Sequence, residues 1–202
     1  MTTPTEFYQI HAQDFSKSRF RIWPSVKELL DSLPPYSTVL DIGCGNGKNM
    51  LYRKDINMTG LEYSEALCEI CINRGLNVVQ GDARSLPFKD NSFDAIIMIA
   101  VIHHIPSDEH YKVLNEISRV LKPNGKALIT NWAVEQPPNS RRTFTRGLNM
   151  VTWKGKEDKP LPYWVMDKEI AEEFIQKIPN GIICKNLKWS AGNWEHWLYR
   201  SN

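Results

Sequence analysis

The sequence lacks any apolar run long enough to cross a membrane, and its N-terminus lacks the apolar core of a signal peptide. We therefore expect a cytoplasmic or nuclear protein that makes no contact with a membrane. The four cysteines are too few for a disulfide framework. The formal net charge of +2 is too small to indicate nucleic-acid binding by itself. These absences favour one domain of ordinary composition over residues 1–202.

Two of the cysteines, Cys68 and Cys71, have the C-x-x-C spacing that is also found in redox and metal sites. They lie in a stretch, residues 66–75, that is mainly apolar, ends in glycine and is typical of a helix. We interpret both cysteines as small core residues rather than a redox or metal pair. The sequence accordingly predicts no metal site in this chain.

One pattern that is present is a glycine-rich turn. The apolar segment Val39–Ile42 is typical of a buried strand, and it leads into glycines at alternate positions over Gly43–Gly47. An acid, Glu62, follows about twenty residues later, where a carboxylate can accept hydrogen bonds from both hydroxyls of a ribose. Lys48 replaces the third glycine of the dinucleotide motif, and the phosphate-binding Gly-Lys-Ser/Thr spacing is absent. The pattern indicates a nucleoside cofactor without a pyrophosphate.

Together with this turn, three further segments, residues 81–88, 93–100 and 119–125, resemble in order the motifs of the class I S-adenosylmethionine-dependent methyltransferases. The resemblance implies an α/β, Rossmann-like fold with a seven-stranded, mostly parallel sheet and helices on both faces. It also implies S-adenosyl-L-methionine as the cofactor, with Asp82 matching the acid that holds the adenine amino group. The cofactor-binding residues expected on this basis are Asp41, Gly43, Gly45, Asn46, Glu62, Tyr63, Asp82, Ala83 and Ala100.

Hydrophobic periodicity and turn residues predict alternating helices and strands. We expect strands near residues 38–42, 57–62, 76–80, 93–99, 125–132, 182–189 and 194–200, and helices near 5–16, 24–33, 107–121 and 167–178. Residues 1–35 would form an N-terminal helical cap. Residues 136–165 do not fit the alternating plan because they hold four prolines and no long periodic run. We predict a loop insertion there, on the substrate side of the site.

Four short segments, residues 18–24, 100–104, 132–136 and 140–142, resemble the eukaryotic tRNA wobble-uridine carboxymethyl methyltransferases, and the resemblance extends from Tyr8 to the end of the chain. It implies methyl esterification of 5-carboxymethyluridine in the tRNA anticodon loop. It also implies that the chain is the catalytic subunit of a complex with a small zinc-binding activator protein. The sequence has no zinc-ligand cluster, so any zinc would belong to that partner. We expect the activator to bind along the edge strand, residues 76–80.

A carboxylate acceptor is already ionised at pH 7 and needs no general base, so the site has to align, desolvate and hold an anion. His103 and His104 could position the substrate, support their loop or act as a base, and the sequence leaves these roles open. The residues expected to be catalytic are His103, His104, Arg19 and Trp132. The residues expected to bind the substrate are Arg21, Trp23, Glu135, Arg141, Arg142 and Arg146.

Two other functions remain open at this point. One is a methyltransferase of the same fold that acts on a small molecule, and the other is an inactive scaffold that binds a partner. The intact acids and glycines of the cofactor motifs argue against the scaffold. The basic segment within 136–165 favours RNA, because an enzyme for a metabolite would more often close its site with an apolar cap.

Overall fold

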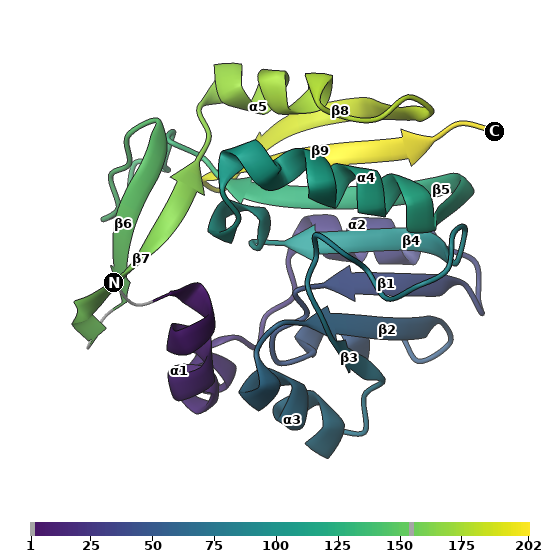
Figure 1. Ribbon diagram of the computed structural model, residues 1–202, viewed down its shortest axis with the longest axis horizontal. Helices are drawn as coiled ribbons and strands as arrows, with labels where there is room; N and C mark the ends of the chain where they lie inside the picture. Colours follow the sequence, from purple (N-terminus) through teal and green to yellow (C-terminus); the bar gives the residue numbers. More distant parts are fainter. Residues whose placement is uncertain (1–2, 154–155) are drawn as a thin grey trace.

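The computed structural model describes residues 3–153 and 156–202, and within them one seven-stranded sheet has the order β3-β2-β1-β4-β5-β9-β8 (Figure 1). Pairs among β1 to β5 are parallel, whereas β9 is antiparallel to both of its neighbours. This arrangement confirms the predicted fold class. The strands are β1 (Thr38–Ile42), β2 (Asn57–Glu62), β3 (Val78–Gln80), β4 (Phe93–Ile99), β5 (Leu121–Trp132), β8 (Ile182–Ser190) and β9 (Asn193–Arg200).

Helices cover both faces of the sheet, with α4 and α5 on one face and α2 on the other (Figure 1). The helix expected at 107–121 begins later, at His110, because Ser107–Glu109 forms a separate 3-10 turn after Pro106. No helix in the described part of the chain is both long and apolar enough to cross a membrane. The helices are α1 (Pro4–Ser18), α2 (Pro24–Asp31), α3 (Glu65–Asn73), α4 (His110–Val120) and α5 (Lys168–Gln176), with 3-10 turns η1 (Lys48–Leu51), η2 (Ile102–His104) and η3 (Ser107–Glu109).

The central strands are buried on both faces, which explains why they read as continuous apolar runs in the sequence. Ile96 and Met98 of β4 face the cluster under α4 and α5, whereas Ala95 and Ile97 face the cluster under α2. Strands β1, β2 and β4 are also parallel to one another. The carboxyl ends of β1, β2 and β4 therefore meet at one edge of the sheet, where ligands bind in open α/β folds.

Residues 136–165 contain a β-hairpin, so the prediction of a loop over this whole segment is wrong. Strands β6 (Gly147–Trp153) and β7 (Lys156–Val165) pair antiparallel as a separate two-stranded sheet. The prolines argued against strands in the sequence, because a proline has no N–H to donate to a neighbouring strand. They are tolerated here because a two-stranded sheet consists of edge strands only. Residues 136–146 contain neither helix nor strand, as expected, and residues 154–155 lie outside the described residues.

The hairpin packs against the N-terminal helix. Val151, Leu161 and Tyr163 share a buried cluster with Phe7 of α1, whose side chain is fully buried. At its other end α1 is tied to the glycine-rich turn, because Asn46 Nδ2 donates hydrogen bonds to the carbonyl oxygens of Ser16, at 3.1 Å, and Arg19, at 2.8 Å. The N-terminal helix thus links the hairpin to the turn after β1.

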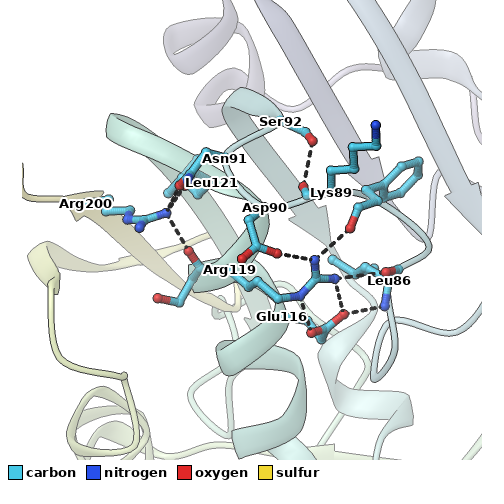
Figure 2. A network of polar contacts seen from close by, with 11 residues as sticks. Leu86, Lys89, Asp90, Asn91, Ser92, Glu116, Arg119, Leu121 and Arg200 are labelled. Carbon is cyan, nitrogen blue, oxygen red and sulfur yellow. Dashed lines mark hydrogen bonds and ion pairs between the residues drawn. The ribbon is translucent and has the colours of Figure 1, made fainter.

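A polar network holds the connection between β3 and β4 (Figure 2). Arg119 of α4 donates to the carbonyl oxygens of Leu86, at 2.9 Å, and Phe88, at 2.7 Å, and it pairs with Glu116 and Asp90. The Glu116 carboxylate in turn accepts the N–H of Leu86 at 2.6 Å. These partly buried contacts of Arg119 with backbone carbonyls hold a segment that begins at the end of β3 and contains no helix or strand.

We predict that Leu161→Ala lowers the free energy of unfolding by about 2–5 kcal/mol, because a fully buried leucine leaves a cavity when it is truncated. Leu148→Ala in the partner strand is the control, since that side chain is 50% exposed and should change stability by less than about 0.5 kcal/mol. Urea unfolding measures both. Equal, small effects would mean that the hairpin does not pack as a structural part of the domain.

Candidate functional site

A cavity of about 630 Å³ opens at the carboxyl ends of β1, β2, β4 and β5, and α1 and the β6–β7 hairpin form its other walls. Its volume lies within the range of small-ligand sites. The structure brings most of the predicted site residues together around it. Those that line the cavity are Arg19, Trp23, Gly43, Gly45, Asn46, Glu62, Tyr63, Asp82, Ala83, Ala100, His103, His104, Trp132 and Arg142.

The turn after β1 depends on glycine for both its backbone angles and its space. Gly43 has φ +69°, and a Cβ there would clash with Cγ2 of Val101. Gly45 has φ +59°, and a Cβ there would lie 2.9 Å from Cε1 of Phe15. A side chain at either position would therefore clash with a wall of the cavity as well as strain the backbone.

The Glu62 carboxylate is the anchor of this turn. One oxygen accepts the N–H of Gly45 at 2.8 Å, and the other accepts the N–H groups of Tyr63 and Ser64 at 2.9 and 3.0 Å. Burial raises the pKa of Glu62 in spite of these three donors. A carboxylate has about four lone-pair sites, so capacity remains for a ligand hydroxyl on the cavity side. Its role at the ribose stays a prediction. The sequence did not reveal its second role, which is to hold the backbone N–H groups of Gly45, Tyr63 and Ser64.

Asp82 is held by an arginine two residues later. Arg84 donates to both carboxylate oxygens of Asp82, with Nη2 at 2.6 Å and Nε at 3.0 and 3.1 Å, and it also pairs with Glu109. Burial by itself would raise the pKa of Asp82, but the hydrogen bonds from Arg84 outweigh it and keep the pKa below the usual value. Asp82 is therefore an ionised acceptor with a fixed orientation at the cavity wall.

Asp41 lies behind the turn rather than on the cavity wall, which corrects the prediction that it contacts the cofactor. It is 1% exposed, and one of its oxygens accepts a hydrogen bond from Asn49 Nδ2 at 3.2 Å. Burial raises the pKa of Asp41 to about 7. Its position at the end of a buried strand puts the side chain under the turn, where it supports Asn49 of the 3-10 turn η1.

The residues at this end of the cavity fit a nucleoside that carries an amino-acid tail. Glu62 and Asp82 provide acceptors for hydroxyl and amino groups, while Arg19 and Lys48 provide cations for a carboxylate. Ala100 also lines the cavity, and its φ of +56° is an uncommon angle for a residue other than glycine. Its N–H donates to Thr130 Oγ1 at 2.9 Å, which holds the end of β4 in this conformation.

Aromatic rings form another part of the cavity wall. The ring of His103 stacks on Tyr163, with centroids 4.5 Å apart at 28°, and Trp132 lies 4.7 Å from Tyr163 at 62°. The guanidinium carbon of Arg142 lies 4.3 Å from the centroid of the Trp132 ring, within cation–π distance. Below, we call these four residues, His103, Trp132, Arg142 and Tyr163, the aromatic end of the cavity.

Both histidines of η2 are neutral at pH 7. Burial, and then the adjacent His104, lower the pKa of His103 well below its usual value. Burial lowers the pKa of His104 to about 3. Nε2 of His104 is 3.0 Å from the hydroxyl of Tyr8, and burial raises the pKa of that phenol well above its usual value. The pair therefore supplies hydrogen-bonding groups and aromatic surface but no positive charge.

Two arginines provide the positive charge near the aromatic rings. Arg19 lies 5.0 Å from the centroid of Trp153 and 5.6 Å from that of Phe15, two rings that stack on each other. Burial lowers the pKa of Arg142, which nevertheless stays protonated because an arginine is charged at any pH a protein meets. An anionic group in the cavity therefore finds a cation at Arg142.

Four predicted substrate-binding residues do not line the cavity: Arg21, Glu135, Arg141 and Arg146. Arg146 forms ion pairs with Asp167, Glu169 and Glu173 around α5, and its role in RNA binding stays a prediction. The sequence could not reveal these pairs, because the acids lie more than twenty residues away along the chain.

Sequence reasoning missed four aromatic residues that line the cavity: Tyr8, Phe15, Trp153 and Tyr163. Tyr8 and Phe15 are seven residues apart, so their common face on a helix was a usable signal. Trp153 and Tyr163 carried no such signal, because they reach the cavity only through the pairing of β6 with β7.

The chain matches the family described as "Methyltransferase domain" over residues 40–129. It is 42% identical over 180 residues to a mouse protein named tRNA (carboxymethyluridine(34)-5-O)-methyltransferase ALKBH8, covering 88% of this chain and 26% of that protein. It is 36% identical over 161 residues to the Saccharomyces cerevisiae tRNA (carboxymethyluridine(34)-5-O)-methyltransferase, covering 77% of this chain and 57% of that protein. The chain thus spans only part of the length of these curated relatives.

Solved structures of the same fold include one described as a complex between the Haloferax volcanii Trm112 methyltransferase activator and the putative methyltransferase. That match has a TM-score of 0.69 at 18% identity and covers 100% of both chains. A Methanosarcina mazei structure described as one of the SAM-dependent methyltransferases has a TM-score of 0.67 at 19% identity, covering 89% of this chain and 98% of that one. At these identities the likeness supports the fold alone.

We predict that Glu62→Ala weakens binding of S-adenosylmethionine at least tenfold, because hydrogen bonds to a charged acceptor contribute about 1.5–3 kcal/mol each. Isothermal calorimetry measures the affinity, and circular dichroism checks that the domain stays folded. Glu69→Ala on the exposed side of α3 is the control for loss of one negative charge, and its affinity should equal that of the wild type. Unchanged affinity in the Glu62 variant would remove this carboxylate from the ligand set.

Proposed function

Because the chain belongs to the family of the tRNA (carboxymethyluridine(34)-5-O)-methyltransferases, we propose that it methylates the carboxylate of 5-carboxymethyluridine at the tRNA wobble position. The product is the methyl ester of that side chain. The chain spans 26% of one of these relatives and 57% of another, so the substrate and the partner are proposed here rather than inherited from them.

The cofactor is S-adenosylmethionine, the cofactor of this family, and the residues at the turn after β1 fit it. When bound, it supplies a methyl group on a positively charged sulfur. Glu62 would accept a hydrogen bond from a ribose hydroxyl, and Asp82 would accept one from the adenine amino group. Arg19 would hold the carboxylate of the amino-acid tail. These roles use the two acids and the cation in the orientations that their neighbours already fix.

The observation that carries the proposal is the position of Arg142 over Trp132, at the aromatic end of the same cavity. A guanidinium binds a carboxylate through two parallel hydrogen bonds, and a ring face stacks a nucleobase. A uridine with a carboxymethyl group needs both. Arg142 would bind the carboxylate, and the rings of Trp132 and Tyr163 would stack on the base.

The acidity of the acceptor explains why neutral histidines suffice. A carboxylic acid with a pKa near 4 is protonated in about one molecule in a thousand at pH 7, so the oxygen that attacks is already an anion. No proton has to be removed, and the work left for the protein is alignment and exclusion of water. His103 and His104 then act as a wall with hydrogen-bonding groups, a role that agrees with their lowered pKa values.

A partner protein fits the exposed edge of the sheet. We propose that a small zinc-binding activator extends the sheet at β3, which is an edge strand of three residues. Beside it, Ile72 of α3 is 60% exposed, as expected for an apolar side chain that a partner would cover. Support comes from the Haloferax volcanii structure of the same fold, whose description names a complex with a Trm112 activator.

The decisive experiment is methyl transfer to tRNA from cells that lack the wobble ester, with and without the activator, followed by nucleoside analysis. The proposed function requires the methyl ester of 5-carboxymethyluridine as the product. Appearance of the label on another nucleoside, or transfer only to small molecules, would contradict it.

Within that assay we predict that Arg142→Ala lowers kcat/KM for tRNA by about 10- to 100-fold, the equivalent of one charge-assisted interaction. Affinity for S-adenosylmethionine should not change, because Arg142 lies at the aromatic end of the cavity. Arg141→Ala is the matched control, since both arginines are exposed but Arg141 does not line the cavity. Equal losses in both variants would point to general charge rather than to a defined carboxylate site.

For the partner, we predict that Val79→Lys abolishes co-purification with the activator and leaves the domain folded, because a charge at this edge opposes strand addition. The control is Ile183→Lys on the other edge strand, β8, where the side chain is 51% exposed. That variant should keep the complex. Survival of the complex in the Val79 variant would mean that the activator binds elsewhere.

A further inference from the structure

A second surface with the chemistry of nucleic-acid binding lies on the face of β8 and β9 that α2 only partly covers. A hollow of about 270 Å³ is lined there by Lys126, Lys185 and Lys188 together with the rings of Trp197 and Tyr199. Figure 1 shows α4 and α5 on the opposite face of the sheet, and α2 behind its central strands. We call these five residues the β8–β9 lysine surface.

Strand pairing puts these side chains on one face. Lys126 of β5 is directly opposite Tyr199 of β9, and Trp197 of β9 is two residues away on the same side of its strand. Nζ of Lys185 lies 3.8 Å from the centroid of the Tyr199 ring. In the register of β8 with β9, Lys188 lies opposite Glu195, which is on the same face of its strand as Trp197. The three lysines therefore converge although they come from two strands.

The lysines of this surface are free to bind an anion. Within the described residues, no ion pair involves Lys126, Lys185 or Lys188, whereas Arg84, Arg119 and Arg146 are each paired with acids. Lys185 and Lys188 are exposed, and Lys126 donates only to a neutral hydroxyl, Ser32 Oγ, at 3.1 Å. Of the acids on this face, Glu28 is exposed, and Glu195 is 2% exposed beneath the surface. The accessible charge is therefore positive.

The strand that carries Lys185 and Lys188 ends at a turn that lines the cavity. The turn between β8 and β9, residues 191–193, lines the cavity, and the strand then leads away from it. At about 3.3 Å per residue, Lys188 lies roughly 10 Å and Lys185 roughly 20 Å along the strand from Ala191. Trp23, which lines the cavity, packs on the same hydrophobic cluster as Trp197, which lines the hollow.

We propose that the β8–β9 lysine surface binds the phosphate backbone of the RNA whose nucleotide enters the cavity. The inference rests on the proposed function and adds a second contact to it. Lysines bind phosphates without reading sequence, and adjacent ring faces contribute stacking or sugar contacts. A stem that leaves the cavity along β8 would meet these three lysines in turn. The surface then orients the RNA, while the cavity selects the nucleotide.

The test is a triple variant, Lys126→Gln, Lys185→Gln and Lys188→Gln, assayed with full-length tRNA. We expect KM to rise at least tenfold with kcat unchanged, and affinity for S-adenosylmethionine to stay the same. The slope of log K for tRNA against log salt should become shallower by about two to three units, since each lost phosphate contact removes about 0.7–0.9 of a released counterion.

A matched triple variant, Lys54→Gln, Lys89→Gln and Lys177→Gln, removes the same charge from exposed positions outside this surface and should behave as the wild type. Wild-type KM and salt slope in the first triple variant would overturn the inference, as would an effect only on binding of an acidic protein.

Failure of the proposed function gives a different result. If the wild-type protein binds tRNA but forms no methyl ester, the proposed function fails, and the salt slope of binding by the two triple variants still decides the inference. If the wild-type protein binds no tRNA, both are overturned.

Discussion

The hydrogen bond from the N–H of Gly45 to the carboxylate of Glu62 is the contact on which the site depends. It joins the turn after β1 to the end of β2, and it is possible only because Gly43 and Gly45 adopt left-handed backbone angles. The same turn presents Asn46 to the carbonyl oxygens at the end of α1. Loss of this hydrogen bond would therefore disturb both the cofactor site and the N-terminal helix that forms one wall of the cavity.

The cavity is divided by charge and by polarity. Its nucleoside end carries two carboxylates, Glu62 and Asp82, each oriented by donors from its own neighbourhood. Its aromatic end carries neutral histidine rings and the guanidinium of Arg142. Such a division suits a cationic methyl donor at one end and an anionic acceptor at the other. It removes the need for a general base, because the reacting oxygen is ionised before it binds.

The local signals in the sequence were sufficient for the parallel half of the fold. Strands β1 and β4 are mainly apolar because both of their faces are buried. Asp167 caps α5, because its side chain accepts a hydrogen bond from the N–H of Ile170 at 2.9 Å. Resemblance to known motifs then placed Gly43, Glu62 and Asp82 on the cavity wall. Each of these features depends on neighbours in the chain or on a motif with fixed spacing.

The sequence by itself determined the order of the strands of the seven-stranded sheet and of its helices, the glycine-rich turn, and the acids at the end of β2 and after β3. Tertiary structure alone decided which side chains share the cavity, because that depends on contacts between distant segments. Pairing of β6 with β7 brought Tyr163 against His103, and Arg146 forms an ion pair at α5 whereas Arg142 lines the cavity. Burial then lowered the pKa of both histidines, and burial is a property of the packed fold that spacing along a chain does not encode.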